Sequence, residues 1–125
     1  MSVINSVVAH IVEHFQPEAV ILFGSHAYGT LHPWSDVDLL VVMETPKGEI
    51  ETALAIADTL PPHAFGVDIL VRSRAVIDQR KAEGDWFLRE ITSKGKVLYE
   101  ADDGRVIEIK KMILNRRQRI RNRFA

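Results

Sequence analysis

Residues 24–41 read GSHAYGTLHPWSDVDLLV, and they join the end of one apolar run to the start of another. A glycine such as Gly24 lets the backbone approach a ligand closely, and the hydroxyl of Ser25 can bond a phosphate oxygen. Asp36 and Asp38 stand at the start of the second apolar run. Side chains two residues apart on a strand point to the same face. The stretch therefore predicts two strands, joined by a loop, whose converging carboxylates lie beside an anion-binding turn.

A third aspartate, Asp68, lies inside the apolar run VDILV at residues 67–71. Aspartate is depleted in strands and is rarely buried without a partner, so each of the three positions is expected to be costly. Like charges on one face repel unless a cation lies between them, and magnesium prefers oxygen ligands. If residues 67–71 pair beside the second strand, the three carboxylates can hold two metal ions about 3.5–4 Å apart. The alternative is that Asp36 is a turn or capping residue and Asp68 an ion-paired residue at a strand edge.

Apolar periodicity predicts the other elements of the chain. The predicted strands cover residues 19–23, 36–43, 65–71 and 96–99. The predicted helices cover residues 3–15, 46–60, 74–83 and 86–94, with Ser73 and Asp85 as caps of the last two. The second strand is apolar on both faces after its first three residues, which is typical of a central strand. The order predicts an α+β fold, a small mixed β-sheet flanked by helices.

The helical patterns also predict which side chains are buried. Thr45 and Pro46 are expected to begin the helix over residues 46–60. The predicted buried stripe of that helix consists of Ile50, Ala53, Leu54, Ala57 and Leu60. Trp86 and Phe87 are expected to lie in the core.

The composition is that of one ordinary globular domain: 125 residues, of which 46% are hydrophobic and 26% charged. The absence of cysteine excludes disulfides and thiolate metal sites. No apolar run approaches the roughly 20 residues that span a bilayer. Residues 1–15 lack a basic leader and a small-residue cleavage site. We therefore expect no membrane association and a cytoplasmic location.

The charge is distributed unevenly along the chain. Residues 1–100 hold 8 basic and 14 acidic residues, whereas residues 101–125 hold 8 basic and 3 acidic ones. We expect residues 1–100 to form the domain and residues 101–125 to form a basic C-terminal helical extension. Docking of its apolar stripe on the body, on a protein partner or on a second copy is favoured over nucleic-acid binding, because aromatic residues do not interleave the basic ones apart from Phe124. A merely solvated extension stays open.

The combined motif resembles the signature of the DNA polymerase beta-like nucleotidyltransferase superfamily. There, Gly-Ser follows a strand, Asp-x-Asp opens the next strand, and a third aspartate lies on a later one. The spacing in this chain, its short length and the ending GKVLYE at residues 95–100 are similar to the minimal nucleotidyltransferase (MNT) branch. The resemblance covers residues 1–100 and implies the nucleotidyltransferase fold.

This resemblance implies a magnesium-dependent transfer of a nucleoside monophosphate, AMP foremost, from a triphosphate such as ATP to an acceptor hydroxyl. Asp36 and Asp38 would ligate both magnesium ions. Asp68 would ligate the catalytic ion and help deprotonate the acceptor. The expected nucleotide-binding residues are Gly24, Ser25, His26 and Ser35.

The sequence departs from the family pattern in its loop. Many members have arginine where this chain has His26 or Tyr28, and neither residue is basic at neutral pH. Arg72, Arg74 or an arginine of a partner is expected to help neutralise the triphosphate.

Minimal members of this superfamily commonly act with a helical HEPN-class protein, a frequent toxin ribonuclease. The resemblance implies that this chain is the antitoxin of such a toxin–antitoxin pair, and in some such pairs the antitoxin adenylylates a tyrosine of its partner. The alternative is a non-catalytic antitoxin that neutralises its partner by contact. The three aspartates favour the enzyme, and the missing loop arginines keep the contact-only function open. Formation of a homo-oligomer also stays open.

Overall fold

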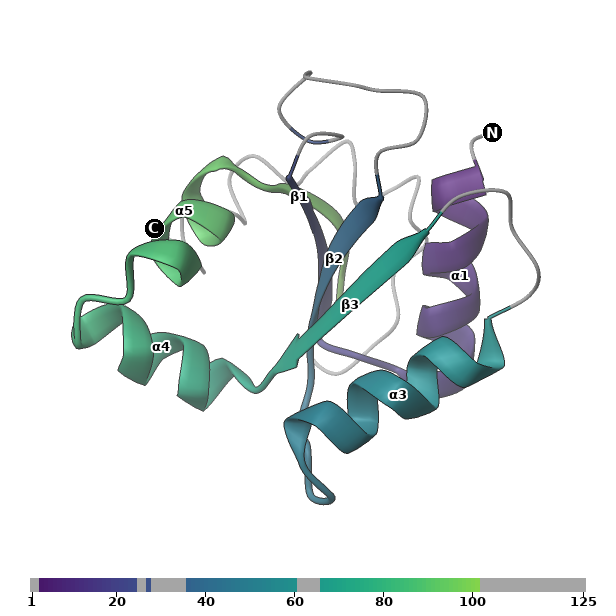
Figure 1. Cartoon of the computed structure of the whole chain (residues 1–125), viewed down its shortest axis with the longest axis horizontal. Helices are drawn as coiled ribbons and strands as arrows, with labels where there is room; N and C mark the ends of the chain where they lie inside the picture. The colour runs from purple at the N-terminus through teal and green to yellow at the C-terminus, as the bar shows by residue number, and fades with distance from the viewer. Residues whose placement is uncertain (1–2, 25–26, 28–35, 61–65, 102–125) are drawn as a thin grey trace.

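The computed structural model describes residues 3–24, 27, 36–60 and 66–101. In chain order, the described elements are α1 (Val3–Phe15), β1 (Ala19–Phe23), β2 (Val37–Val42), α3 (Glu49–Thr59), β3 (Val67–Arg72), α4 (Arg74–Ala82), α5 (Trp86–Lys94) and β4 (Lys96–Glu100) (Figure 1). This order confirms the predicted mixture of helices and strands. The predicted extension lies, apart from Ala101, outside the described residues. None of the described helices is long and apolar enough to cross a membrane.

The strands form one mixed sheet in the order β3-β2-β1-β4. β1 pairs antiparallel with both β2 and β4, while β2 pairs parallel with β3. Helices α1 and α3 lie on one face of the sheet, and α4 and α5 lie on the other (Figure 1). The parallel pair is possible because α3 crosses over between its strands. The fold thus has three layers, with the sheet in the middle.

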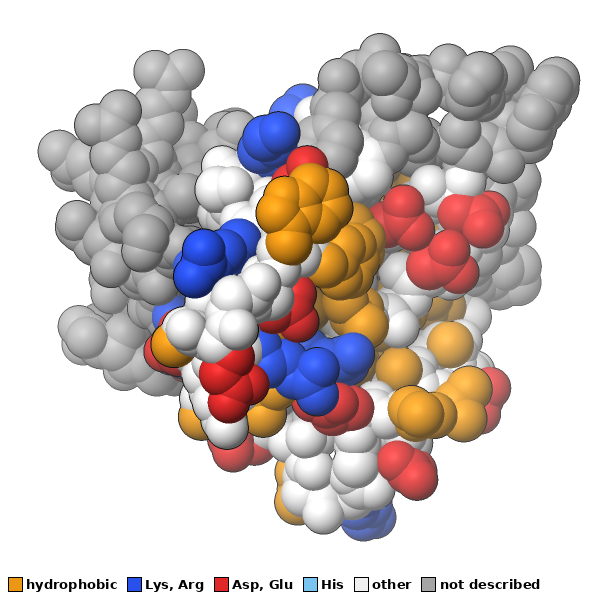
Figure 2. Space-filling view, turned by 60° about the vertical axis from the view of Figure 1, so that its left-hand side comes forward, with side chains coloured by type: hydrophobic (Ala, Val, Ile, Leu, Met, Phe, Trp, Pro, Cys, Tyr) orange, Lys and Arg blue, Asp and Glu red, His pale blue; other side chains and the backbone are white. Residues whose placement is uncertain are grey.

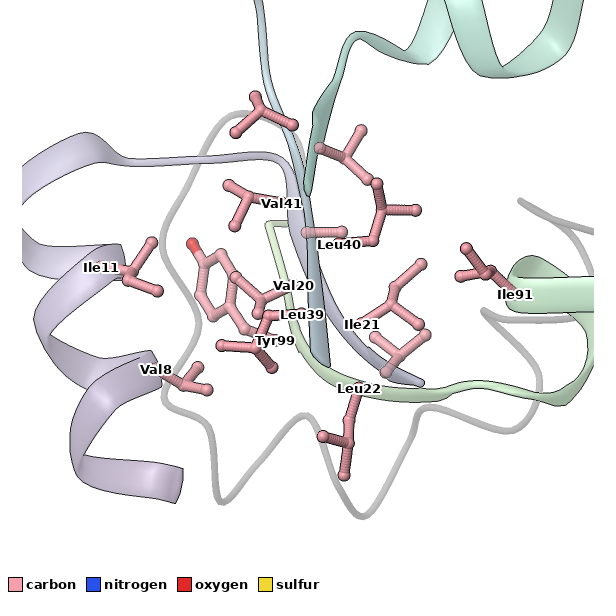
Figure 3. Close-up of a cluster of buried hydrophobic side chains, with 14 of the residues drawn as sticks. Val8, Ile11, Val20, Ile21, Leu22, Leu39, Leu40, Val41, Ile91 and Tyr99 are labelled. Carbon is pink, nitrogen blue, oxygen red and sulfur yellow. The ribbon is translucent and has the colours of Figure 1, made fainter. Parts of the chain in front are cut away.

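The core lies on both faces of the sheet (Figure 3). Val8 and Ile11 of α1 point toward strand residues that include Tyr99, and Ile91 of α5 lies on the opposite side of the sheet. Residues 39–42 of β2 have no exposed surface, which confirms the prediction of a central strand. Each such side chain contributes roughly 1.5–3 kcal/mol on full burial. Burial also raises the pKa of the Tyr99 hydroxyl above its ordinary value.

Two predicted helix caps are confirmed. The Val76 amide donates a hydrogen bond of 3.2 Å to the Ser73 hydroxyl at the start of α4. The Leu88 amide donates one of 2.9 Å to the Asp85 carboxylate at the start of α5. Both caps satisfy an amide that has no partner within the helix, and they determine where each helix begins.

The predicted start and buried face of α3 are wrong. The helix begins at Glu49, after Gly48, whose φ of 111° requires a glycine. Ile56 is its buried residue, whereas Ile50 is 73% exposed and Leu54 60% exposed. Among the predicted stripe residues, Ala53 and Leu60 do pack against the core. These two positions and Ile56, spaced three and four residues apart, form the stripe that faces the core, which leaves Leu54 beside that stripe.

Candidate functional site

Asp38 and Asp68 are brought together by the parallel pairing of β2 with β3. Their Cα atoms are register partners, so the two side chains project from the same face of the sheet, about 5 Å apart in the hydrogen-bonding direction. The Val37 amide donates a 2.9 Å hydrogen bond to the Gly66 carbonyl, which aligns the starts of the two strands. The sequence predicted that Asp68 lies beside the other aspartates if residues 67–71 pair beside the second strand. They do pair there, so this condition is fulfilled.

Asp36 lies one residue before β2 and is exposed. Its carboxylate lies directly against the α-carbon of Gly66, where a Cβ atom would overlap a carboxylate oxygen. Glycine at position 66 therefore leaves the space that this carboxylate occupies. Nothing in the pattern of residues 24–41 indicated this contact, although a glycine two residues before Asp68 was a usable signal.

Gly24 has the same relation to Asp38. A Cβ atom at position 24 would overlap an Asp38 carboxylate oxygen and lie 3.2 Å from its Cγ. The φ of Gly24 is 76°, in the left-handed region that favours glycine. The Ala27 amide donates a 3.0 Å hydrogen bond to the Gly24 carbonyl, so the chain turns directly after β1. Both conformation and close contact thus require a glycine here.

The burial expected for the three aspartates is wrong for two of them. Asp36 and Asp68 are exposed, and Asp38 is half-buried. The reason is that these residues lie where β2 and β3 begin, where the sheet is still open to solvent. Figure 2 shows acidic side chains gathered on this face beside a band of hydrophobic side chains.

The donor chemistry at this end of the sheet suits a hard cation, because every candidate ligand is a carboxylate oxygen. As the side chains lie, however, no three His, Cys, Asp or Glu residues in the described part of the chain converge closely enough to hold a metal ion. The Asp38 carboxylate lies against Gly24 and the Asp36 carboxylate against Gly66. Ser25, His26 and Ser35 lie outside the described residues.

The two arginines expected near the triphosphate lie elsewhere. Arg72 is four residues beyond Asp68 on β3, about 13 Å along the strand, and its guanidinium is 3.5 Å from Glu49. The Arg74 guanidinium is 3.4 Å from Glu18. Both pairs are at the opposite end of β3 from Asp68, so the expectation that these arginines serve the site is not supported.

An aromatic pair borders the aspartates and was missed. Phe23 is the register partner of Asp38 on β1, so both side chains project from one face. The Phe87 ring of α5 meets the Phe23 ring edge to face, with 5.8 Å between centroids and an interplanar angle of 83°. Phe87 is 48% exposed and Trp86 is 69% exposed, so the prediction that both lie in the core is wrong. Leu88, Ile91 and Thr92 are the buried residues of α5 instead.

Known proteins resemble this chain in sequence pattern and in fold. A family model described as a nucleotidyltransferase domain matches residues 4–120. A solved Sulfolobus solfataricus structure, of a protein assigned as a nucleotidyltransferase, is similar with a TM-score of 0.56 and 19% identity over 83% of each chain. A toxin-antitoxin structure with AMP-PNP is similar with a TM-score of 0.48 and 20% identity, over 94% of this chain and 95% of that one. No curated protein matches. The match to the family model confirms the predicted nucleotidyltransferase fold.

Proposed function

Because the chain belongs to the nucleotidyltransferase domain family, we propose that it transfers AMP from ATP to an acceptor hydroxyl with the help of magnesium. The observation that carries the proposal is the register of Asp38 with Asp68 across adjacent parallel strands, with Asp36 two residues before Asp38. Three carboxylates at one open end of a sheet suit the binding of a metal–triphosphate complex rather than of a bare anion.

Each aspartate has a role in the proposed reaction. Asp36 and Asp38 would hold the magnesium ions, and Asp68 would help to hold one of them and would accept the proton of the acceptor hydroxyl. Bound magnesium supplies positive charge that offsets the triphosphate and polarises its phosphoryl oxygens. A bond forms between the acceptor oxygen and the α-phosphorus, and the bond from that phosphorus to the oxygen bridging to the β-phosphate breaks. Pyrophosphate leaves, and the acceptor carries AMP.

Gly24 and the residues next to it would bind the triphosphate. The chain turns at Gly24 directly beside the Asp38 carboxylate, and a turn of this kind after a strand can present backbone amides to an anion. Ser25, His26 and Ser35 complete the proposed nucleotide-binding residues. Backbone amides and metal would supply most of the positive potential, since Arg72 and Arg74 pair with glutamates away from the site.

We also propose that the acceptor is a tyrosine of a HEPN-class toxin and that the chain is its antitoxin. The proposal rests on the resemblance to the minimal nucleotidyltransferases, whose partners belong to that class. The test is incubation of the full chain with α-labelled ATP, magnesium and a candidate HEPN-class partner protein. Label on a partner tyrosine and loss of ribonuclease activity are expected. Neutralisation without label would identify a contact-only antitoxin instead.

ATP is expected to bind tightly only with a divalent cation. Without one, the three carboxylates repel the triphosphate, so ATP affinity falls by at least about tenfold in EDTA. Calorimetric titration of ATP with and without magnesium measures the difference in affinity. A titration in which potassium chloride replaces magnesium chloride at the same ionic strength controls for screening of the carboxylate charges. Equal affinities in both conditions would exclude a metal-bridged site.

Gly66→Ala is expected to weaken magnesium-dependent ATP binding by about 10- to 100-fold, the effect of losing support for a metal ligand. The new methyl group would displace the Asp36 carboxylate, which lies against this glycine. The melting temperature should stay near that of the wild type, because Gly66 is not among the glycines with positive φ and Asp36 is exposed. Calorimetry and thermal unfolding together check the result. Unchanged ATP affinity would mean that Asp36 is not a ligand.

A further inference from the structure

Phe87 is an aromatic residue of α5 that the rest of the fold covers only in part. Its ring meets Phe23 edge to face, yet 48% of the residue remains exposed. Phe23 is itself half-buried, and Ile21, two residues earlier on the same strand face, is fully buried. The buried part of this face of β1 therefore ends just before the aromatic pair, and the pair lies at the edge of the core.

The aromatic pair of Phe23 and Phe87 lies next to the aspartates on one face of the sheet. Phe23, Asp38 and Asp68 are register partners on β1, β2 and β3 and so form one row across a single face of the sheet. The strand spacing places Phe23 about 5 Å from Asp38 and about 10 Å from Asp68. A hydrophobic band lies directly beside acidic side chains on this face (Figure 2). A ligand with charged phosphates at one end and a flat apolar ring at the other fits that row.

We propose that Phe87, supported edge-on by Phe23, is the stacking platform for the nucleobase of the triphosphate. The inference rests on the proposed function, since it assigns a base site next to the proposed phosphate and metal site. A base–aromatic stack accepts every base because each has a π-face, so this platform selects for the presence of a base and not for its identity. The chain's own fold thus supplies a base site at the end of the sheet where the phosphates bind.

Trp86 provides a matched control. It precedes Phe87 in α5 and is more exposed, at 69%. It lines a surface hollow with Arg89, Glu90 and Ser93, which lie three, four and seven residues further along the helix. This face of α5 differs from the one that meets Phe23. Removing Trp86 therefore removes a more accessible aromatic ring of the same helix without touching Phe87 or Phe23.

The experiment compares two ligands, ATP and inorganic tripolyphosphate, each titrated by calorimetry with magnesium. Tripolyphosphate has the phosphates but no base. Phe87→Ala is expected to weaken ATP binding about tenfold, or about 1.4 kcal/mol, and to leave tripolyphosphate binding unchanged. Phe87→Leu, which keeps apolar contact with Phe23, should behave in the same way, and Phe87→Trp should restore ATP binding. Trp86→Ala should bind both ligands like the wild type.

Each other outcome contradicts the platform in a distinct way. An equal loss of affinity for both ligands in Phe87→Ala and Phe87→Leu would mean that Phe87 has a structural role. An unchanged affinity for ATP would mean that the base binds elsewhere, while the proposed function stands. An equal effect of Trp86→Ala would mean that general exposed aromatic surface is responsible. If the wild-type protein binds neither ligand with magnesium, the proposed function fails, and the platform fails with it.

Discussion

Asp38→Asn is expected to abolish nucleotidyl transfer while leaving the fold intact. Asparagine has nearly the same shape, but it cannot supply the charge that the metal ions require. Loss of metal-based stabilisation worth several kcal/mol corresponds to at least about a 100-fold lower rate. Asp38 is the central residue of the row, with Phe23 on one side and Asp68 on the other.

The stability of the Asp38→Asn protein should lie within about 1 kcal/mol of the wild type, because one of several like charges on the same face is removed. Thermal unfolding and transfer of labelled AMP are the two measurements. Asp58→Asn is the control, since Asp58 is an exposed aspartate on α3 and not a member of the row. A much lower melting temperature would assign Asp38 a structural role, and wild-type transfer would remove it from the chemistry.

Gly24→Ala is expected to lose both stability and transfer. The residue has a φ of 76°, which strains any side-chain-bearing residue by about 1–2 kcal/mol. The added methyl group would also overlap the Asp38 carboxylate, and this carboxylate would have to leave its present position. We therefore expect at least about a 100-fold loss of transfer, as for Asp38→Asn, together with a lower melting temperature.

Gly84→Ala is the control that separates backbone strain from overlap with the Asp38 carboxylate. Gly84 has a φ of 93°, but a Cβ atom there would have no neighbour within 4 Å. The strain is comparable, so a similar fall in unfolding free energy of about 1–2 kcal/mol is expected, with wild-type transfer retained. If Gly24→Ala keeps wild-type transfer as well, contact with Gly24 does not determine the position of Asp38. If both variants lose transfer equally, the loss reflects stability alone.

Local chemistry made several elements predictable from the sequence. The caps at Ser73 and Asp85 are confirmed because capping depends on one side chain and an amide three residues away. The central strand is confirmed because its apolar residues alternate onto two faces that both need cover. Gly24 could be predicted as a turn residue because the turn that follows a strand also depends on local sequence.

Exposure of helix residues could not be predicted in the same way. Periodicity predicts that α3 and α5 have apolar stripes, but the rotation of each helix against the sheet decides which residues are buried. On α3 that rotation buries Ile56 and exposes Leu54. On α5 the rotation of the helix buries Leu88 and leaves Phe87 partly exposed at the edge of the core. Both helices have apolar residues at neighbouring positions. The apolar pattern of each helix is therefore compatible with more than one rotation of the helix about its axis.

The types and order of the elements, and the grouping of the aspartates with Gly24, could be read from the amino-acid sequence, because they depend on local propensity and on spacing along the chain. Three contacts depend on tertiary packing: Asp38 is the register partner of Asp68, Gly66 makes room for Asp36, and Phe87 meets Phe23. Each of these contacts joins elements whose separation along the chain carries no information on register. A slip of one residue in the parallel pair would turn Asp68 to the opposite face, and packing of both sheet faces against helices is what excludes that slip.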